Sequence, residues 1–368
     1  MIETSSVFKT ELLFSLAALL AAFLTAFFTT PLAKKLAVRC NCFDVPDGKR
    51  KMHHEPIPYF GGLSIFGGFA VAAIVFSLIW TKGIASDIAV MLIGSICICF
   101  VGLLDDMYDI RPLYKMLAQV SVSAFTVYFG GAIEYTTVFG FTIRLGALAF
   151  PVTVLWLVLI INAVNLIDGL DGLASGVSAL ESFALLITSL IMGNPICALA
   201  SAALCGAVLG FLPFNSNRAS IFMGDAGSMV IGYIMACISV FGLFKAQALF
   251  SIVVPALIFA LPVMDTVLAF FRRIFKGQNP FQADRQHLHH KLLDSGFTAR
   301  QSVLVIYIAS AVFCIASILY MKYKWIALSL VVVGFAFLEI LKYRKKISQF
   351  LKRERVSDDA VQNSGTSL

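Results

Sequence analysis

Residues 152–176 read VTVLWLVLIINAVNLIDGLDGLASG, an apolar run that passes directly into a polar one. Two amides and two carboxylates recur there at every third position: Asn162, Asn165, Asp168 and Asp171. Neighbours at this spacing share one face of a helix. Gly169 and Gly172 predict that the helix breaks here, so that polar side chains and backbone groups converge. Because carboxylates at the mouth of an apolar helix are unfavourable without a role, we expect a functional site rather than a hydrophilic loop.

The composition is that of a membrane protein. Of the 368 residues, 59% are hydrophobic and 13% are charged, whereas soluble domains average about 25% charged. Apolar runs of membrane-spanning length recur along the chain, which predicts an all-α polytopic integral membrane protein. Most of the eight cysteines lie in these runs and show neither a disulfide framework nor zinc-like spacing.

Eleven membrane spans are predicted: 11–31, 59–80, 88–104, 113–130, 147–163, 174–192, 196–213, 227–243, 248–271, 302–320 and 326–341. The first has no cleavage site and carries its lysines mainly after it, which favours an uncleaved helix with the N-terminus outside. The C-terminus is then cytoplasmic, and 22 of the 28 Lys and Arg residues lie on the cytoplasmic side. This asymmetry explains the net charge of +7 without nucleic acid. We expect residues 1–343 to form one transmembrane domain and residues 344–368 a disordered tail.

Adjacent carboxylates, Asp105 and Asp106, end the third span on the predicted cytoplasmic side. Two such charges repel unless a cation lies near, so the pair is a candidate for metal binding, for a general base, or for both. A solvated helix end is the plain alternative. Lys115 follows closely and either contacts a phosphate or marks the basic boundary of the fourth span.

A third carboxylate, Asp225, stands between glycines in the stretch Met223–Ser228. The Gly-Ser pair that enters the next span is expected to present helix N-terminal amides to an anion. Together with the other carboxylates and Asn165, Asp225 forms an oxygen-rich set suited to Mg²⁺ or Mn²⁺ rather than zinc.

Three of the five histidines lie in one predicted cytoplasmic segment: His287, His289 and His290. Zinc is an alternative here, but Arg285 and Lys291 alongside favour a loop that binds phosphate. A second basic loop contains Lys51 and His54, which are candidates for phosphate or lipid-headgroup contact. The alternative is an ordinary basic juxtamembrane loop.

Taken in order, these motifs resemble the polyprenyl-phosphate N-acetylhexosamine-1-phosphate transferase family, of the glycosyltransferase family 4 type. The resemblance spans residues 51–290. The Asn-Leu-Ile-Asp-Gly-Leu-Asp-Gly and His-Leu-His-His forms are similar to the branch that starts teichoic acid, O-antigen (lipopolysaccharide) and related glycans. They look less like the muramoyl-pentapeptide branch. Tyr59 departs from the family, whose members often carry a basic residue before the Gly-Gly.

The resemblance implies a reaction at the cytoplasmic face of a bacterial plasma membrane. A sugar 1-phosphate would pass from a UDP-N-acetylhexosamine, expected to be UDP-GlcNAc, to undecaprenyl phosphate, with release of UMP. The implied cofactor is Mg²⁺ or Mn²⁺, and the partners are both substrates and membrane lipid. The preferred hexosamine and a homodimer are left open.

The resemblance also implies roles for individual residues. Asp225 would bind the metal with Asn165, while Asp105 would deprotonate or orient the lipid phosphate and Asp106 would support the metal or phosphates. The remaining candidates would bind substrate: Lys51, His54, Lys115, Asp168, Asp171, His287, His289 and His290. Which aspartate is the base, and whether an aspartyl-phosphate forms, stays open at this level.

Two rival functions fit less well. A proton-coupled transporter would place its carboxylates near the bilayer midplane and often shows an inverted repeat, which this sequence lacks. A phosphatidyl-type alcohol transferase needs an arginine after the Asp-Gly-x-Ala of its signature, whereas Ser175 stands at that position. The donor is therefore expected to be a uridine nucleotide.

Overall fold

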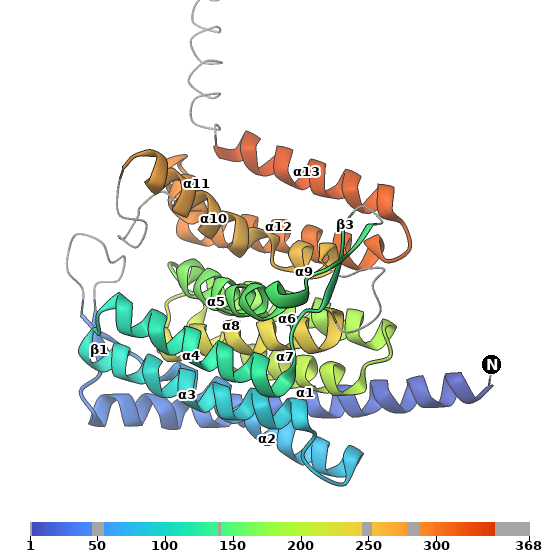
Figure 1. The fold of residues 1–368 in the computed structure, drawn as a ribbon. Coiled ribbons are helices and arrows are strands. Elements are labelled where there is room, and N and C mark those ends of the chain that lie inside the picture. The colour runs from blue at the N-terminus through green and yellow to red at the C-terminus, as the bar shows by residue number, and fades with distance from the viewer. Residues whose placement is uncertain (1, 46–54, 139–140, 245–251, 278–286, 343–368) are drawn as a thin grey trace, which may run out of the picture.

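The computed structural model describes residues 2–45, 55–138, 141–244, 252–277 and 287–342, most of which are helical. The helices run side by side as a bundle, with α1 along one edge and α13 along the opposite edge (Figure 1). They are α1 (Ile2–Arg39), α2 (Gly61–Thr81), α3 (Ser86–Tyr108), α4 (Pro112–Gly130), α5 (Ala149–Ile167), α6 (Leu173–Ile191), α7 (Pro195–Asn215), α8 (Gly224–Ile238), α9 (Val253–Ile258), α10 (Ala260–Phe275), α11 (Leu288–Asp294), α12 (Ala299–Tyr320) and α13 (Lys324–Lys342).

Nine helical segments of the described chain are long and apolar enough to cross a membrane. They coincide with nine of the eleven predicted spans, so the prediction of an all-α polytopic membrane protein is confirmed. The predicted span 113–130 is helix α4, which is too polar to join this group. The predicted span 248–271 is not one helix, because α9 and α10 meet at Phe259. The count of eleven and the orientation stay predictions.

Two short antiparallel ribbons mark opposite ends of the bundle (Figure 1). β1 (Phe43–Asp44) pairs with β2 (Ile57–Pro58) at the end where α3 stops and α8 begins. β3 (Tyr135–Val138) pairs with β4 (Phe141–Arg144) between α4 and α5, at the other end. A 3₁₀ turn, η1 (Gly146–Leu148), leads into α5, and a π-helical turn, η2 (Ser239–Phe244), extends α8.

Helix α8 is the centre of the bundle. Every residue from Ala226 to Ile238 is buried, and the helix packs against α2, α3, α5, α6 and α7. Inside this packing, the hydroxyl of the fully buried Tyr233 lies 2.7 Å from that of Thr126 on α4. A helix that is apolar on all sides is stable only when protein or lipid surrounds it. The first turn of α8, with Asp225, therefore emerges at the middle of one end of the bundle.

Candidate active site

The adjacent carboxylates at the end of α3 have different partners. Asp105 accepts hydrogen bonds from the backbone nitrogen of Ile110 at 3.1 Å and from the ammonium of Lys115 at 2.8 Å. Asp106 faces the start of α8 instead. Successive side chains of a helix point about 100° apart, so two adjacent residues at one helix end contact different neighbouring helices. The predicted pair thus divides into one carboxylate beside a lysine and one beside a helix start.

The Asp106 carboxylate caps helix α8. It accepts hydrogen bonds from the backbone nitrogens of Asp225 at 2.7 Å and Ala226 at 3.3 Å. A carboxylate at a helix N-terminus satisfies unpaired amides and complements the helix dipole. Gly224 allows this approach, because a Cβ there would lie 2.3 Å from Asp106 and its φ is +69°. The expectation that these amides would be open to an anionic ligand is corrected, since a carboxylate of the same chain occupies them.

Lys115, in the first turn of α4, joins the two remaining carboxylates. Its ammonium donates to Asp105 and also to Asp225. The side chains of Lys115, Asp105 and Asp225 are 20%, 12% and 27% exposed, so the cluster is largely enclosed yet reachable. Two carboxylates this close repel unless a positive charge lies between them. In this cluster, two acidic side chains therefore share one positive charge, the ammonium of Lys115.

Amide side chains connect helices α4, α5 and α8 next to the cluster of Lys115, Asp105 and Asp225. Asn165, near the end of α5, donates to the hydroxyl of Ser228 on α8 at 2.9 Å. One turn earlier, Asn162 donates to the buried Gln119 of α4 at 2.6 Å, and Gln119 donates to the sulfur of Met229 at 3.2 Å. These bonds join α4, α5 and α8. Gln119 was not a predicted site residue, although it lies one helical turn after Lys115 on the same face.

The predicted helix break lies between α5, which ends at Ile167, and α6, which starts after Gly172 with a φ of +76°. Burial, followed by the negative charges of Asp225 and Asp171, raises the pKa of Asp168 to about 7. Asp171 is exposed and accepts a hydrogen bond from the backbone nitrogen of Ala219 at 2.9 Å. Of the two aspartates, Asp168 therefore interacts electrostatically with the carboxylate cluster. Asp171 instead forms a hydrogen bond with the segment that precedes α8.

The histidine motif is anchored by a carboxylate that was not predicted as a site residue. Asp265, on α10, lies 2.9 Å from Nδ1 of His287 and accepts the backbone N–H of Leu288 at 2.9 Å. His287 is 4% exposed, so this contact is enclosed. A carboxylate bonded to one ring nitrogen fixes the orientation of a histidine and leaves the other nitrogen for a ligand. The signal in the sequence was a single carboxylate in an apolar segment.

The His289 ring lies against the turn between α5 and α6, and the other two histidine rings lie beside it. The rings of His287 and His289 are parallel, with centroids 6.0 Å apart, and those of His289 and His290 are 4.3 Å apart. A Cβ added to Gly169 would lie 2.5 Å from Nε2 of His289, so a side chain there would displace the histidine ring. Burial and the neighbouring His290 lower the pKa of His289 to about 4. His289 is thus neutral near pH 7 and presents one N–H donor.

Lys51 and His54 lie outside the described residues, but both flanks of their segment are held at this end of the bundle. Pro58, just after it, accepts a hydrogen bond from the backbone nitrogen of Phe222 at 2.9 Å. Before it, β1 pairs with β2, which contains Pro58. The described residues on either side of this segment therefore lie beside the residues that precede α8.

The oxygen donors can be tested against a divalent metal. Within the described ranges, no three His, Cys, Asp or Glu side chains gather as a complete metal site. The chain supplies Asp105 and Asp225, with the amide of Asn165 next to α8. Mg²⁺ is commonly bound by only one or two carboxylates and completes its shell with water and substrate phosphates. These donors therefore fit Mg²⁺ or Mn²⁺, and they do not fit zinc.

One end of the bundle thus combines a carboxylate pair, a lysine and a cluster of histidines. Phosphoryl transfer depends on positioning and charge neutralisation more than on covalent chemistry. The lysine and histidines suit phosphate oxygens, and the carboxylates suit a cation that phosphates share. A site at the end of a bundle of membrane-spanning length is also accessible both from lipid and from water.

Comparison with known proteins gives consistent matches. The profile of glycosyl transferase family 4 matches residues 88–243, which run from α3 through α8. The "Probable undecaprenyl-phosphate N-acetylglucosaminyl 1-phosphate transferase" of Bacillus subtilis is 38% identical over 85% of this chain and 87% of its own. The decaprenyl-phosphate N-acetylglucosaminephosphotransferase of Mycolicibacterium smegmatis is 35% identical over 78% of each chain. The undecaprenyl-phosphate alpha-N-acetylglucosaminyl 1-phosphate transferase of Salmonella typhi is 30% identical over 93% of this chain and 95% of its own.

Proposed function

The chain belongs to glycosyl transferase family 4, and on that premise we propose that it transfers N-acetylglucosamine 1-phosphate from UDP-N-acetylglucosamine to undecaprenyl phosphate. It is a phosphoglycosyl transferase, and its relatives are named for transfer to undecaprenyl or decaprenyl phosphate. UMP leaves in the proposed reaction. The product is a lipid-linked diphosphate sugar for a surface glycan such as teichoic acid or O-antigen.

The observation that carries this proposal is the convergence of Asp105 and Asp225 on Lys115. The reaction joins two phosphate-bearing substrates, so the site must gather negative charge and neutralise it. Lys115 would contact a phosphate, while Asp105 and Asp225 would hold a divalent cation that neutralises charge there. Asp105, which shares Lys115 with Asp225, is assigned to orient or deprotonate the lipid phosphate. Asp106 positions Asp225 through the start of α8.

The remaining side chains divide by their surroundings. His287 is held by Asp265, and His289 lies against Gly169, which supports a role for the histidine cluster in holding the diphosphate with His290. Asp168 is assigned to the nucleotide sugar, because its turn lies against the histidines. Asp171 belongs to the framework. We also assign Lys51 and His54 to phosphate or headgroup contact on the basis of the sequence.

Mg²⁺ or Mn²⁺ would be held by Asp225, with Asn165 and Asp105 as neighbouring oxygen donors. When bound, it would neutralise the diphosphate and make UMP a better leaving group. Aspartate and asparagine supply the hard oxygen ligands that these ions prefer.

We further propose that the N-terminus lies outside and that the site faces the cytoplasm of a bacterium. The distribution of 22 of the 28 Lys and Arg residues supports this orientation. Helix α4 and the α9–α10 pair would add two membrane crossings to the nine long apolar helices, which gives the proposed eleven. Helix α4 packs between α3 and α5, as a spanning helix would. Residues 1–343 would form the membrane domain, and the tail 344–368 lies beyond the described residues.

The proposal is tested by identifying both products. The purified protein is incubated with undecaprenyl phosphate, Mg²⁺ and one of three donors: UDP-GlcNAc, UDP-GalNAc or UDP-MurNAc-pentapeptide. We expect lipid-dependent release of UMP from UDP-GlcNAc, with a lipid product heavier by one N-acetylhexosamine phosphate. Reaction with only one of the other donors would overturn the donor assignment. Release of UMP without any lipid product would overturn the transfer itself.

A further inference from the structure

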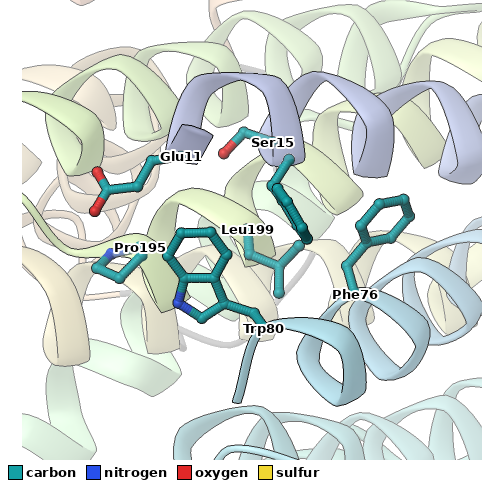
Figure 2. Close-up of a pocket in the computed structure, with 7 residues that line it drawn as sticks. Glu11, Ser15, Phe76, Trp80, Pro195 and Leu199 are labelled. Carbon is teal, nitrogen blue, oxygen red and sulfur yellow. The ribbon is translucent and has the colours of Figure 1, made fainter. Parts of the chain in front are cut away.

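A cleft lies at the end of the bundle opposite to the active site, where α1 and α7 begin and α2 ends. It contains about 240 Å³ of space not filled by atoms, part of which opens to the surroundings (Figure 2). Its lining comes from all three helices and includes Glu11, Phe14, Ser15, Phe76, Trp80 and Pro195. None of these residues belongs to the catalytic machinery described above.

Two polar groups of the cleft have no partner in the described part of the chain. The Glu11 carboxylate makes no hydrogen bond or ion pair there. Ser15, one turn later on α1, is 3% exposed, and its hydroxyl also makes no hydrogen bond to a described residue. A helical serine commonly returns its hydroxyl to the carbonyl one turn earlier. Figure 2 shows the Ser15 hydroxyl pointing toward the Glu11 side of the cleft, and both residues line this cleft.

Aromatic rings supply the opposite wall. Trp80 lies across the cleft from Ser15 (Figure 2), and Phe14 packs against it edge to face, with centroids 5.0 Å apart. Phe76 lies 6.3 Å from Phe14 in a similar edge arrangement. The face of an indole ring attracts cations, more strongly than other aromatic rings do. A carboxylate, a free hydroxyl and aromatic rings around one space are therefore complementary to a cation that donates hydrogen bonds.

The lining of the cleft restricts which cation fits. Glu11 and Ser15 accept hydrogen bonds, and a primary ammonium donates three, whereas a trimethylammonium group donates none. A metal ion would need several oxygen ligands, but the lining offers Glu11 and Ser15 among apolar side chains. The hydrogen-bonding chemistry of the lining therefore selects a primary amine.

The surroundings of the cleft indicate where the amine comes from. Apolar side chains lie exposed beside it, including Leu13 at 67% and Ile79 at 58% exposure. Such side chains on spanning helices face acyl chains, and tryptophan at the end of a span is typical of the level of lipid headgroups. We propose that the cleft binds the primary ammonium of a phosphoethanolamine-type phospholipid in the leaflet opposite to the active site.

The proposal is tested by native mass spectrometry of the full-length protein, titrated with dilauroyl phosphatidylethanolamine or dilauroyl phosphatidylcholine. The two lipids differ only in the methylation of the amine. We expect the wild type to bind the ethanolamine lipid roughly tenfold more tightly, which is the scale of a hydrogen bond between an ammonium and a carboxylate that choline cannot make. Glu11→Gln should reduce this preference to about twofold or less, whereas Trp80→Leu should weaken the binding of both lipids, because a trimethylammonium group also contacts aromatic faces.

A matched control is Glu134→Gln, which removes an exposed carboxylate at the same end of the bundle. This variant should keep the wild-type preference, and all variants should keep the transferase activity and melting temperature of the wild type. Equal binding of the two lipids by the wild type would overturn the proposal, as would an unchanged preference in Glu11→Gln. The last measurement is competition between the lipid and free ethanolamine. If it displaced the lipid at equal concentration, the site would be one for a soluble amine and the assignment to lipid would be wrong.

Discussion

The Asp106 carboxylate accepts a hydrogen bond from the backbone nitrogen of Asp225 at 2.7 Å, which joins the end of α3 to the start of α8. The two helices also touch at Gly102, where an added Cβ would lie 2.3 Å from the Cα of Ala226. Asp225 is therefore placed by a contact between backbones rather than by a flexible loop. Of the two adjacent aspartates, Asp106 caps the start of α8 and Asp105 contacts Lys115.

Replacement of Asp106 by asparagine is predicted to lower both activity and stability. The amide keeps one oxygen, but it removes the negative charge from the start of α8 and presents an NH₂ group to a backbone N–H. We expect kcat to fall by roughly tenfold or more and the unfolding free energy by about 1 kcal/mol. The measurement is UMP release together with a melting curve in detergent. Lost activity at an unchanged melting temperature would instead mean that Asp106 acts on the substrates directly.

Replacement of Lys115 by methionine is predicted to change how the protein responds to metal. Without the ammonium, Asp105 and Asp225 repel each other until a divalent cation binds. In EDTA the variant should melt several degrees below the wild type, by the scale of about 1–3 kcal/mol. Addition of Mg²⁺ should raise its melting temperature more than that of the wild type. Lys35→Met, an exposed change on α1, is the control. Equal Mg²⁺ shifts in all three proteins would contradict the shared-cation arrangement.

Replacement of Gly62 by alanine is predicted to disturb the site from a distance. The new Cβ would lie 2.3 Å from the backbone nitrogen of Gly227, so the first turn of α8 must move. Overpacking of this kind costs about 1–3 kcal/mol, and the displaced Asp225 should reduce kcat strongly. Gly67→Ala on the same helix is the control, since nothing lies within 4 Å of its Cβ. It should leave activity intact. Normal activity in Gly62→Ala would contradict the close approach of α2 and α8.

The lowered pKa of His289 predicts a dependence of stability on pH. The unfolded side chain titrates near 6.5 and the folded one near 4, so the unfolded state binds more protons between these values. Stability from this residue is present above pH 6.5 and is lost as the pH falls toward 4. Melting curves between pH 7.5 and 5 should therefore decline less steeply for His289→Gln than for the wild type. Parallel curves would show that His289 is not held neutral by burial.

The sequence predicted the helix break after Ile167 and several of the described side chains that meet at one end of the bundle. The spacing of these residues along the sequence is sufficient for this prediction. Polar side chains at span ends on the same side of the membrane must gather there. The partner of His287 was not predictable in the same way. Asp265 comes from α10, 22 residues earlier, and only the packing of that helix brings them together. The cap that Asp106 forms on α8 was missed for the same reason. Adjacent carboxylates look equivalent until the neighbouring helix is placed.

The most direct test of the central claim is a Mg²⁺ titration of lipid-dependent UMP release by the wild type and Asp225→Asn. Asp294→Asn, which removes an exposed carboxylate at the end of α11, is run in parallel. We predict that Mg²⁺ activates both the wild type and Asp294→Asn, and that neither releases UMP in EDTA. Asp225→Asn should lose at least roughly a hundredfold in kcat at any Mg²⁺ concentration. Mg²⁺-dependent release that persists at the wild-type rate in Asp225→Asn would contradict the account.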